Sequence, residues 1–198
     1  SGGSSTESVQ ENWSTLLGVT GANGIVHGHQ VHGTKIYTHH TASDGLNIFP
    51  DCDGHVTNSS GVLLTVTTAD CVPIILFDKK NQIIGCIHAG WKGAFSGIIE
   101  NTIRKFKKLG QKNTIYATVG PCIGNKSYEV DLDFYRKFIS KSKKNKIYFT
   151  RRNENKKLFD LRKYVNDKLI KLNVQVDHIR KDTFKEKSSF FSYRRSQI

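Results

Sequence analysis

The sequence predicts a single α/β domain, a layered sandwich in which helices flank a mixed, largely antiparallel central sheet. Two observations carry that prediction. Short runs rich in β-branched residues, bounded by Gly, Asn and Asp, fill much of the chain between residues 24 and 88. Beyond Gly93 the apolar residues recur at steps of three and four, which is the helical period. With 198 residues, of which 37% are hydrophobic and 24% charged, the chain is long enough to bury one core.

The expected elements follow one another without a linker or an internal repeat. Residues 1–12 are polar and rich in Ser and Gly, so we expect a frayed terminus there and one catalytic α/β domain over residues 13–198. The expected helix over residues 95–109 has the clearest end, because basic residues cluster in its last turns and Gly110 follows as a stop. We expect strands within residues 24–37, 61–68, 72–77, 82–88, 114–119 and 174–179, and helices over residues 95–109, 132–140 and 158–172.

The net charge of +13 is distributed unevenly along the chain. Residues 1–100 carry a net charge of −4 and seven of the eight histidines, whereas residues 101–198 carry +17. Such an excess of Lys and Arg suggests nucleic acid as a partner. The basic runs, however, fall on expected helix faces and loops and are not interleaved with aromatic residues, so we expect a solvated surface and no nucleic-acid partner.

The cellular setting is expected to be the cytoplasm. No apolar run approaches the roughly 20 residues of a membrane span, and no basic and apolar leader opens the sequence. The four cysteines are widely spaced and form no C-x-x-C pair, which favours reduced thiols. We therefore expect no membrane partner; the sequence leaves the oligomeric state open.

Cys71 and His88 are the first candidate site residues. Two expected strands, 72–77 and 82–88, are separated by a polar segment of hairpin length. If the hairpin is symmetric about Lys79 and Lys80, Cys71 lies directly opposite His88, with Cβ atoms roughly 4.5–5.5 Å apart. A thiol and an imidazole at that distance can serve as nucleophile and base, as two ligands of a zinc ion, or as a buried structural pair.

Further candidates surround this pair. If residues 27–32 continue as a strand, His27 and His29 share one face and His32 the other, and spacing alone does not choose between His29 and His32 as a ligand. Asp53 lies in an Asp- and Gly-rich turn, where it either belongs only to the turn, orients a ligand, or acts as a catalytic acid or base.

Anion-binding candidates lie at two other places. Lys92 lies in a Gly-bounded turn that leads from a strand into a helix, a setting that suits a phosphate. Arg194 and Arg195 follow two phenylalanines and a tyrosine, so aromatic and cationic groups are available together for a planar or phosphorylated ligand. Cys122, in a rigid Gly- and Pro-bounded loop, is expected to be structural.

Six motifs in order resemble the bacterial YfiH-like family, which has also been called laccase-domain, polyphenol oxidase and peptidoglycan editing factor. Any one of them is weak, but six in order over residues 24–195 are specific. One difference is that Lys92 follows HAGW, where the family usually has Arg, so that the charge is kept but the bidentate fork is lost. The motifs are HQVHG at 29–33, DCDGHVT at 51–57, TADCVPI at 68–74, HAGWKG at 88–93, GPCIG with YEV within 120–130, and FFSYRR at 190–195.

The resemblance implies a metal site and an activity. It implies one zinc ion, ahead of copper, held by His32, Cys71 and His88, with one coordination position left open. The implied activity is phosphorolysis of adenosine, inosine and methylthioadenosine, with adenosine deamination as a second reaction. A purine nucleoside and phosphate would then be the partners, with Cys71, His88 and Asp53 as catalytic candidates and Lys92, Arg194 and Arg195 as phosphate ligands.

Three other functions stay open on the sequence alone. A metal-free cysteine hydrolase would use Cys71 and His88, with cell-wall precursors as substrates in keeping with the editing name. A basic nucleic-acid-binding module would use the second half of the chain. A laccase-like polyphenol oxidase ranks last, because the histidines are few and scattered for several copper ions.

Overall fold

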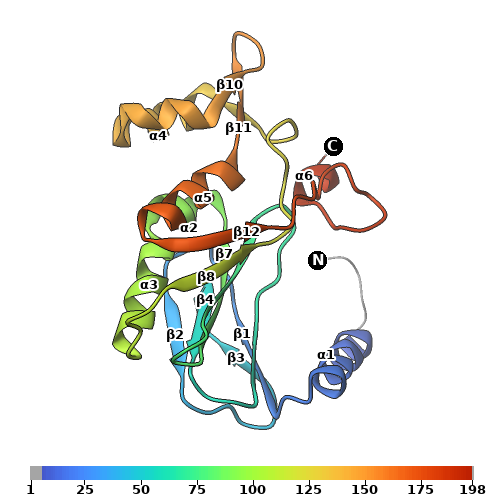
Figure 1. Ribbon diagram of the computed structural model, residues 1–198. Coiled ribbons are helices and arrows are strands. Elements are labelled where there is room, and N and C mark those ends of the chain that lie inside the picture. Colours follow the sequence, from blue (N-terminus) through green and yellow to red (C-terminus); the bar gives the residue numbers. More distant parts are fainter. Residues whose placement is uncertain (1–5, 198) are drawn as a thin grey trace.

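A six-stranded mixed sheet forms the centre of the molecule in the computed structural model, which describes residues 6–197 (Figure 1). The strand order is β12-β8-β6-β7-β4-β2. The three inner pairings are antiparallel and the two outer ones are parallel, so the predicted mixed, largely antiparallel sheet is confirmed. Its strands are β2 (Ile36–His39), β4 (Gly54–Thr57), β6 (Val72–Asp78), β7 (Ile83–Ala89), β8 (Ile115–Val119) and β12 (Val174–His178).

Three helices cover one face of this sheet: α2 (Trp91–Ser96), α3 (Ile98–Lys108) and α5 (Leu161–Lys171). The α3 helix packs on β2, β4 and β7, and α5 packs on β6 and β12. Alternation along β6 places Ile74 and Leu76 in the core and leaves Ile75 and Phe77 largely exposed on the opposite face. The core therefore lies between the sheet and the helices, as the helical period beyond Gly93 predicted.

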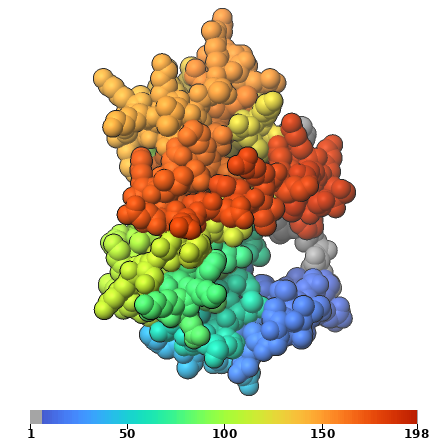
Figure 2. All heavy atoms as spheres, in the orientation of Figure 1, coloured from blue at the N-terminus to red at the C-terminus, as the bar shows by residue number. Residues whose placement is uncertain are grey.

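Two smaller sheets of three strands each accompany the central sheet. Parallel strands β1 (Gly24–Gly28), β3 (Gly45–Phe49) and β5 (Val62–Thr65) form one, in the order β3-β1-β5. Antiparallel strands β9 (Glu129–Asp131), β10 (Phe149–Arg151) and β11 (Lys156–Phe159) form the other. With α4 (Leu132–Lys141) and the 3₁₀ turn η1 (Lys143–Tyr148), this second sheet makes the orange lobe in Figure 2.

Helix α1 (Thr6–Thr20) begins within the segment for which a frayed terminus is expected; residues 1–5 lie outside the described residues. The rings of Trp13 in α1 and His27 in β1 lie 5.2 Å apart, which joins the helix to the first sheet. None of the helices in the described range combines the length and the apolar composition that crossing a membrane requires.

Two further element boundaries differ from the prediction. The expected strand over residues 24–37 is two strands with a loop between them, and that loop carries His32. The expected helix over residues 158–172 begins only at Leu161, because residues 156–159 pair as β11 before Asp160 caps the helix. Close to the C-terminus, the short helix α6 (Tyr193–Ser196) carries Arg194 and Arg195.

Candidate metal centre and cavity

Three candidate ligands converge from three separate segments. His32 lies in the loop after β1, Cys71 directly precedes β6, and His88 lies near the end of β7. One ligand atom from each side chain lies within 4.8 Å of the other two. The imidazole rings of His32 and His88 meet edge to face, with centroids 4.8 Å apart. Two imidazoles and a thiol at these separations fit a zinc-type ion with three protein ligands and one open position.

Cys71 and His88 come together through a register that differs from the predicted one. In the β6–β7 hairpin His88 pairs with Pro73, because the four turn residues are 79–82 in place of the expected 78–81; Gln82 in that turn adopts a positive φ of 52°. Continuing this register places Cys71 opposite Gly90. The shift is two residues, and a two-residue shift keeps every side chain on its face of the sheet. The prediction of direct opposition is therefore wrong, whereas the shared face is confirmed.

His32 owes its position to a turn. The chain leaves β1 at Gly28, and His32 adopts a left-handed φ of 59°, so the strand alternation expected for these histidines does not apply. Asp53 stabilises the turn: its carboxylate accepts hydrogen bonds from the backbone N–H groups of Val31 (3.2 Å), His32 (2.9 Å) and Gly33 (2.7 Å). The free energy of these bonds offsets the cost of the left-handed conformation.

The other histidines of this region have different partners. The side chain of His29 is exposed and its Nδ1 lies 3.6 Å from a carboxylate oxygen of Asp51. The Nδ1 atom of His27 lies 3.1 Å from the Thr65 hydroxyl. The geometry thus favours His32 over His29, the two histidines between which the spacing did not choose.

Asp53 also orients His88. Its Oδ1 atom lies 2.7 Å from Nδ1 of His88, and both side chains are buried. This bond leaves Nε2 of His88 as the nitrogen available to a metal, an arrangement in which the carboxylate fixes the ring and its tautomer. Burial acts to raise the pKa of Asp53, but the hydrogen bonds from His88 and from the Gly33 and Val31 amides outweigh it, and the pKa is lowered.

Asp53 is therefore a positioning residue. It is fully buried, and it is absent from the described lining of the cavity beside the three ligands. The described contacts of the carboxylate are with the turn of His32 and with His88, and a role of Asp53 as catalytic acid or base stays a prediction.

A cavity of about 460 Å³ opens beside His32 and Cys71. Its lining combines aromatic rings with cations, as ligand pockets for planar anionic molecules do. Lys92 lies at the start of α2, with its ammonium 5.8 Å from the centroid of the Trp91 ring. Arg194 lies over the ring of Tyr128 at 5.3 Å. The described lining consists of His32, Ala69, Asp70, Cys71, Trp91, Lys92, Ile123, Tyr128, Leu161, Tyr193 and Arg194.

Arg194 and Arg195 have different surroundings. Arg194 lines the cavity while its Nη1 donates to the Glu129 carbonyl at 2.7 Å. The guanidinium of Arg195 donates to the carbonyl oxygens of Thr183, Phe184 and Phe190, and Arg195 is not among the described residues that line the cavity. The structure thus gives Arg195 the role of holding the C-terminal segment together, in place of the expected phosphate contact.

Asp70 is a site residue that the sequence reasoning missed. Its buried carboxylate accepts hydrogen bonds from the hydroxyls of Thr183 and Ser192 and from the backbone N–H of Arg194. Asp70 adopts a φ of 85° immediately before Cys71, so one residue joins the C-terminal segment to a metal-ligand position. Its place in the TADC motif was the available signal, but the partners lie more than 110 residues away in sequence.

The thiol of Cys71 is poorly suited to act as a free nucleophile. Burial, followed by the charge of Asp70, raises the pKa of Cys71 to about 12. Such a thiol carries little thiolate at neutral pH, which disfavours the cysteine-hydrolase alternative. A coordinated cation deprotonates a thiol directly, which agrees with a ligand role.

The described residues contain one group of three or more His, Cys, Asp or Glu side chains placed to share a metal ion, namely His32, Cys71 and His88. The set has three donors. That number suits a single ion, and it does not supply the several centres that a multicopper oxidase requires.

Comparison with known proteins gives one family and one fold. Residues 1–198 match the family described as multi-copper polyphenol oxidoreductase laccase. The sequence is 38% identical over 190 residues to a purine nucleoside phosphorylase of Rickettsia conorii, covering 95% of this chain and 78% of the relative. It is 40% identical over 169 residues to a purine nucleoside phosphorylase of Rickettsia prowazekii, covering 84% and 69%.

Two solved structures have a fold similar to that of this chain. A Neisseria meningitidis protein of the DUF152 family superposes with a TM-score of 0.83 at 27% identity, covering 98% of this chain and 78% of that one. The hypothetical protein YfiH of Bacillus licheniformis superposes with a TM-score of 0.87 at 24% identity, covering 96% and 77%. The second likeness concerns the fold alone.

Proposed function

The chain belongs to the laccase-like YfiH family, and from that membership we propose that it is a zinc-dependent purine nucleoside phosphorylase. One observation carries the proposal: the side chains of His32 and Cys71, two members of a three-donor metal site, line a cavity that also contains aromatic rings and cations. The names of the curated relatives support a nucleoside and phosphate as substrates. We extend the proposal to adenosine, inosine and methylthioadenosine, with adenosine deamination as a second reaction.

The donor set supports zinc. His32, Cys71 and His88 offer two nitrogens and one sulfur, the borderline and soft ligands that zinc binds with one position left open. When bound, the ion polarises a water or substrate oxygen at that position. Asp53 maintains the site by fixing the His88 tautomer and the His32 turn.

Phosphorolysis requires a phosphate oxygen to form a bond with C1′ of the ribose while the bond from C1′ to the purine nitrogen breaks. In the proposed arrangement the Lys92 ammonium and the Arg194 guanidinium hold the phosphate by charge-assisted hydrogen bonds. The rings of Trp91 and Tyr128 offer faces on which a purine can stack. Because part of the Arg194 guanidinium is held by the Glu129 carbonyl, its position is fixed before the phosphate arrives.

The proposal is tested by incubating the purified protein with adenosine in the presence and absence of phosphate. We expect adenine and ribose 1-phosphate only when phosphate is present, and slower formation of inosine in both cases. His88→Ala should lose bound zinc and lower both activities by at least about a hundredfold, because a metal-site ligand and its oriented ring are removed together.

His40→Ala is the matched control, because His40 is exposed and belongs neither to the three candidate ligands nor to the described lining of the cavity. It should retain both zinc and activity. If His88→Ala keeps full activity and metal content, the assignment of the site is wrong. If the wild-type protein releases no base in the presence of phosphate, the proposed reaction is wrong although the metal site can stand.

A further inference from the structure

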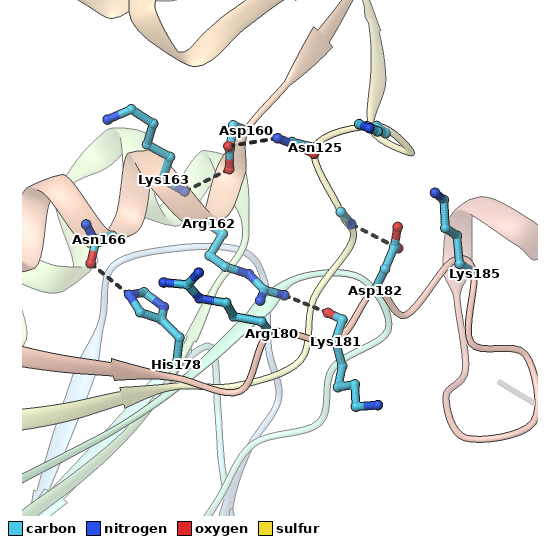
Figure 3. Close-up of a pocket in the computed structure, with 12 residues that line it drawn as sticks. Asn125, Asp160, Arg162, Lys163, Asn166, His178, Arg180, Lys181, Asp182 and Lys185 are labelled. Carbon is cyan, nitrogen blue, oxygen red and sulfur yellow. Dashed lines mark hydrogen bonds between the residues drawn. The ribbon is translucent and has the colours of Figure 1, made fainter.

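A second cavity, separate from the metal site, lies where three segments meet (Figure 3). Its volume is also about 460 Å³, and its lining shares no residue with that of the first cavity. The segments are the loop after β8, the first turns of α5 and the end of β12 with the residues that follow it. The described lining consists of Gly124, Asn125, Lys126, Asp160, Arg162, Lys163, Asn166, His178, Arg180, Lys181, Asp182 and Lys185.

The lining has six Lys and Arg side chains and two carboxylates. Both carboxylates are occupied by local donors. Asp160 caps α5 by accepting from the Lys163 amide, and it accepts a second bond from the Asn125 side chain. Asp182 accepts from the Gly124 amide and the Ser127 hydroxyl. The two acids thus stabilise the walls of the cavity and do not pair with its cations.

Four of the cations have no ion-pair partner among residues 6–197: Lys126, Arg162, Arg180 and Lys185. Lys163 and Lys181 pair with Asp167 and Glu186, both of which lie outside the lining. The cavity therefore keeps an excess of positive charge that the protein itself does not neutralise.

Part of this charge is held in a fixed position. The guanidinium of Arg162 donates to the carbonyl oxygens of Ile179 and Lys181, so it cannot swing away into solvent without losing both bonds. Figure 3 shows Arg162 and Arg180 next to His178. Cations that are oriented in advance bind an anion with a smaller loss of side-chain entropy.

His178 contributes an unused polar atom. Its Nε2 lies 2.9 Å from the Asn166 side-chain oxygen, whereas its Nδ1 is buried and has no hydrogen-bond partner among the described residues. Burial, and after it the charges of Arg162 and Arg180, lowers the pKa of His178. Because Nε2–H donates to Asn166, Nδ1 of the neutral ring is a hydrogen-bond acceptor, and a ligand with a hydroxyl group or a protonated phosphate oxygen would satisfy it.

We propose that this cavity binds the phosphate chain of an oligophosphate-bearing ligand. Its volume lies in the range of about 300–1,000 Å³ that small-molecule pockets span, so it can hold more than a single small ion. Apart from the imidazole of His178, the described lining contains no aromatic or aliphatic side chain, which favours a chain of phosphates over a purely apolar ligand. Lys and Arg are the side chains that bind phosphate oxygens most strongly.

The test is a calorimetric titration with inorganic tripolyphosphate at constant ionic strength. The variant Lys126→Gln/Arg180→Gln/Lys185→Gln removes three of the four unpaired cations and leaves Arg162, which the Ile179 and Lys181 carbonyls hold. We expect its affinity for tripolyphosphate to fall by at least about tenfold, because several charge-assisted hydrogen bonds are lost. The single variant Arg180→Gln should show a smaller loss in the same direction.

The matched control is Lys79→Gln/Lys80→Gln/Lys112→Gln, which removes the same net charge at exposed positions outside both cavities. Its affinity should stay within about twofold of that of the wild type, since screened distant charges contribute little. An equal loss in both triple variants would show a nonspecific charge effect and overturn the proposal, as would the absence of binding to the wild type.

Two further arms identify where and what the probe binds. Lys92→Gln changes the metal-side cavity, so a loss of tripolyphosphate binding in this variant alone would place the probe there and contradict the proposal. Adenosine triphosphate distinguishes the sources of the phosphate chain. If adenosine triphosphate binds more tightly than tripolyphosphate, the ligand is a nucleotide; if the two bind equally, it is a free oligophosphate. Both results support the cavity, provided that the triple cavity variant binds the two compounds more weakly than the wild type does.

Discussion

One carboxylate, that of Asp53, orients two of the three candidate metal ligands. It accepts hydrogen bonds from three backbone N–H groups of the turn that carries His32, and it contacts Nδ1 of His88. The sequence placed Asp53 near the site but offered several roles for it, because an Asp- and Gly-rich turn is compatible with all of them. Its role follows from contacts to residues that lie 20–35 positions away, which no local pattern encodes.

We expect Asp53→Asn to impair the metal site without touching the ligands. An amide group can accept at one atom only, so its NH₂ would face the N–H groups of Gly33 or Val31 and leave buried donors unsatisfied. The loss in unfolding free energy should be on the order of 3 kcal/mol, and the zinc affinity should fall by about tenfold to a hundredfold. Chemical denaturation and metal competition measure the two effects.

Asp51→Asn is the control for this substitution. Asp51 is exposed and has a φ of 46°, a conformation that Asn tolerates well. Its stability and metal affinity should match those of the wild type. If Asp53→Asn also has the stability and metal affinity of the wild type, the carboxylate does not position the ligands.

Gly90 makes a second specific prediction. A Cβ atom there would lie 2.8 Å from Cδ2 of His32 and 3.0 Å from Sγ of Cys71. The backbone of Gly90, with a φ of −67°, is one that alanine adopts freely, so crowding of the two ligands is the main effect. Gly90→Ala should therefore lower zinc affinity by at least about tenfold, a loss of more than about 1.4 kcal/mol in binding free energy.

Gly18→Ala is the comparison for Gly90→Ala, because a Cβ atom at Gly18 would meet nothing within 4 Å. It should leave zinc affinity unchanged and stabilise helix α1 slightly. Isothermal titration with zinc after chelator treatment measures both variants. Equal affinities would mean that the ligands do not require the space that Gly90 leaves.

Among the strands and turns, the β6–β7 hairpin shows how far sequence reasoning reaches. The polar segment predicted the hairpin and its four-residue turn correctly, but the turn lies one residue further along the chain, at residues 79–82, which shifts the register by two. The error was harmless to the site, since a shift of two preserves the face of the sheet. The strand β4 was missed because its Asp- and Gly-rich approach is typical of a turn, although Gly54 allows the close contact with Ile36 and Ile87.

The C-terminal segment depends on a carboxylate that titrates. Burial acts to raise the pKa of Asp182, but the hydrogen bonds from the Ser127 hydroxyl and the Gly124 and Phe184 amides outweigh it, and the pKa is lowered. A carboxyl group whose pKa is lower in the folded state contributes stability above its unfolded pKa, and that contribution is lost as the pH falls through the folded value.

Asp182→Asn should accordingly lower the unfolding free energy by on the order of 1 kcal/mol at neutral pH. The difference from the wild type should shrink below about pH 4, where the wild-type carboxylate becomes protonated as well. Urea denaturation from pH 7 to pH 3 checks this, with the exposed Asp177→Asn as a control. A difference independent of pH would show that the charge of Asp182 does not contribute.

Across the whole molecule, the candidate metal ligands and the excess of positive charge lie in different halves of the sequence. The first hundred residues, with a net charge of −4, supply His32, Cys71 and His88, and the remainder, with +17, supplies Arg194 and the second cavity. The sequence predicted the fold class and the face shared by Cys71 and His88, since both follow from local periodicity. It could not predict the convergence of the C-terminal segment on Asp70, which depends on tertiary contacts across more than 110 residues.

The central claim is that His32, Cys71 and His88 together hold one metal ion. Anomalous diffraction above and below the zinc absorption edge, from crystals of protein purified without added metal, tests it most directly. We expect one peak per chain, about 2.0–2.1 Å from a ring nitrogen of each histidine and about 2.3 Å from Sγ of Cys71. A peak bound by other residues, or no zinc peak from protein shown by elemental analysis to carry zinc, would contradict the assignment.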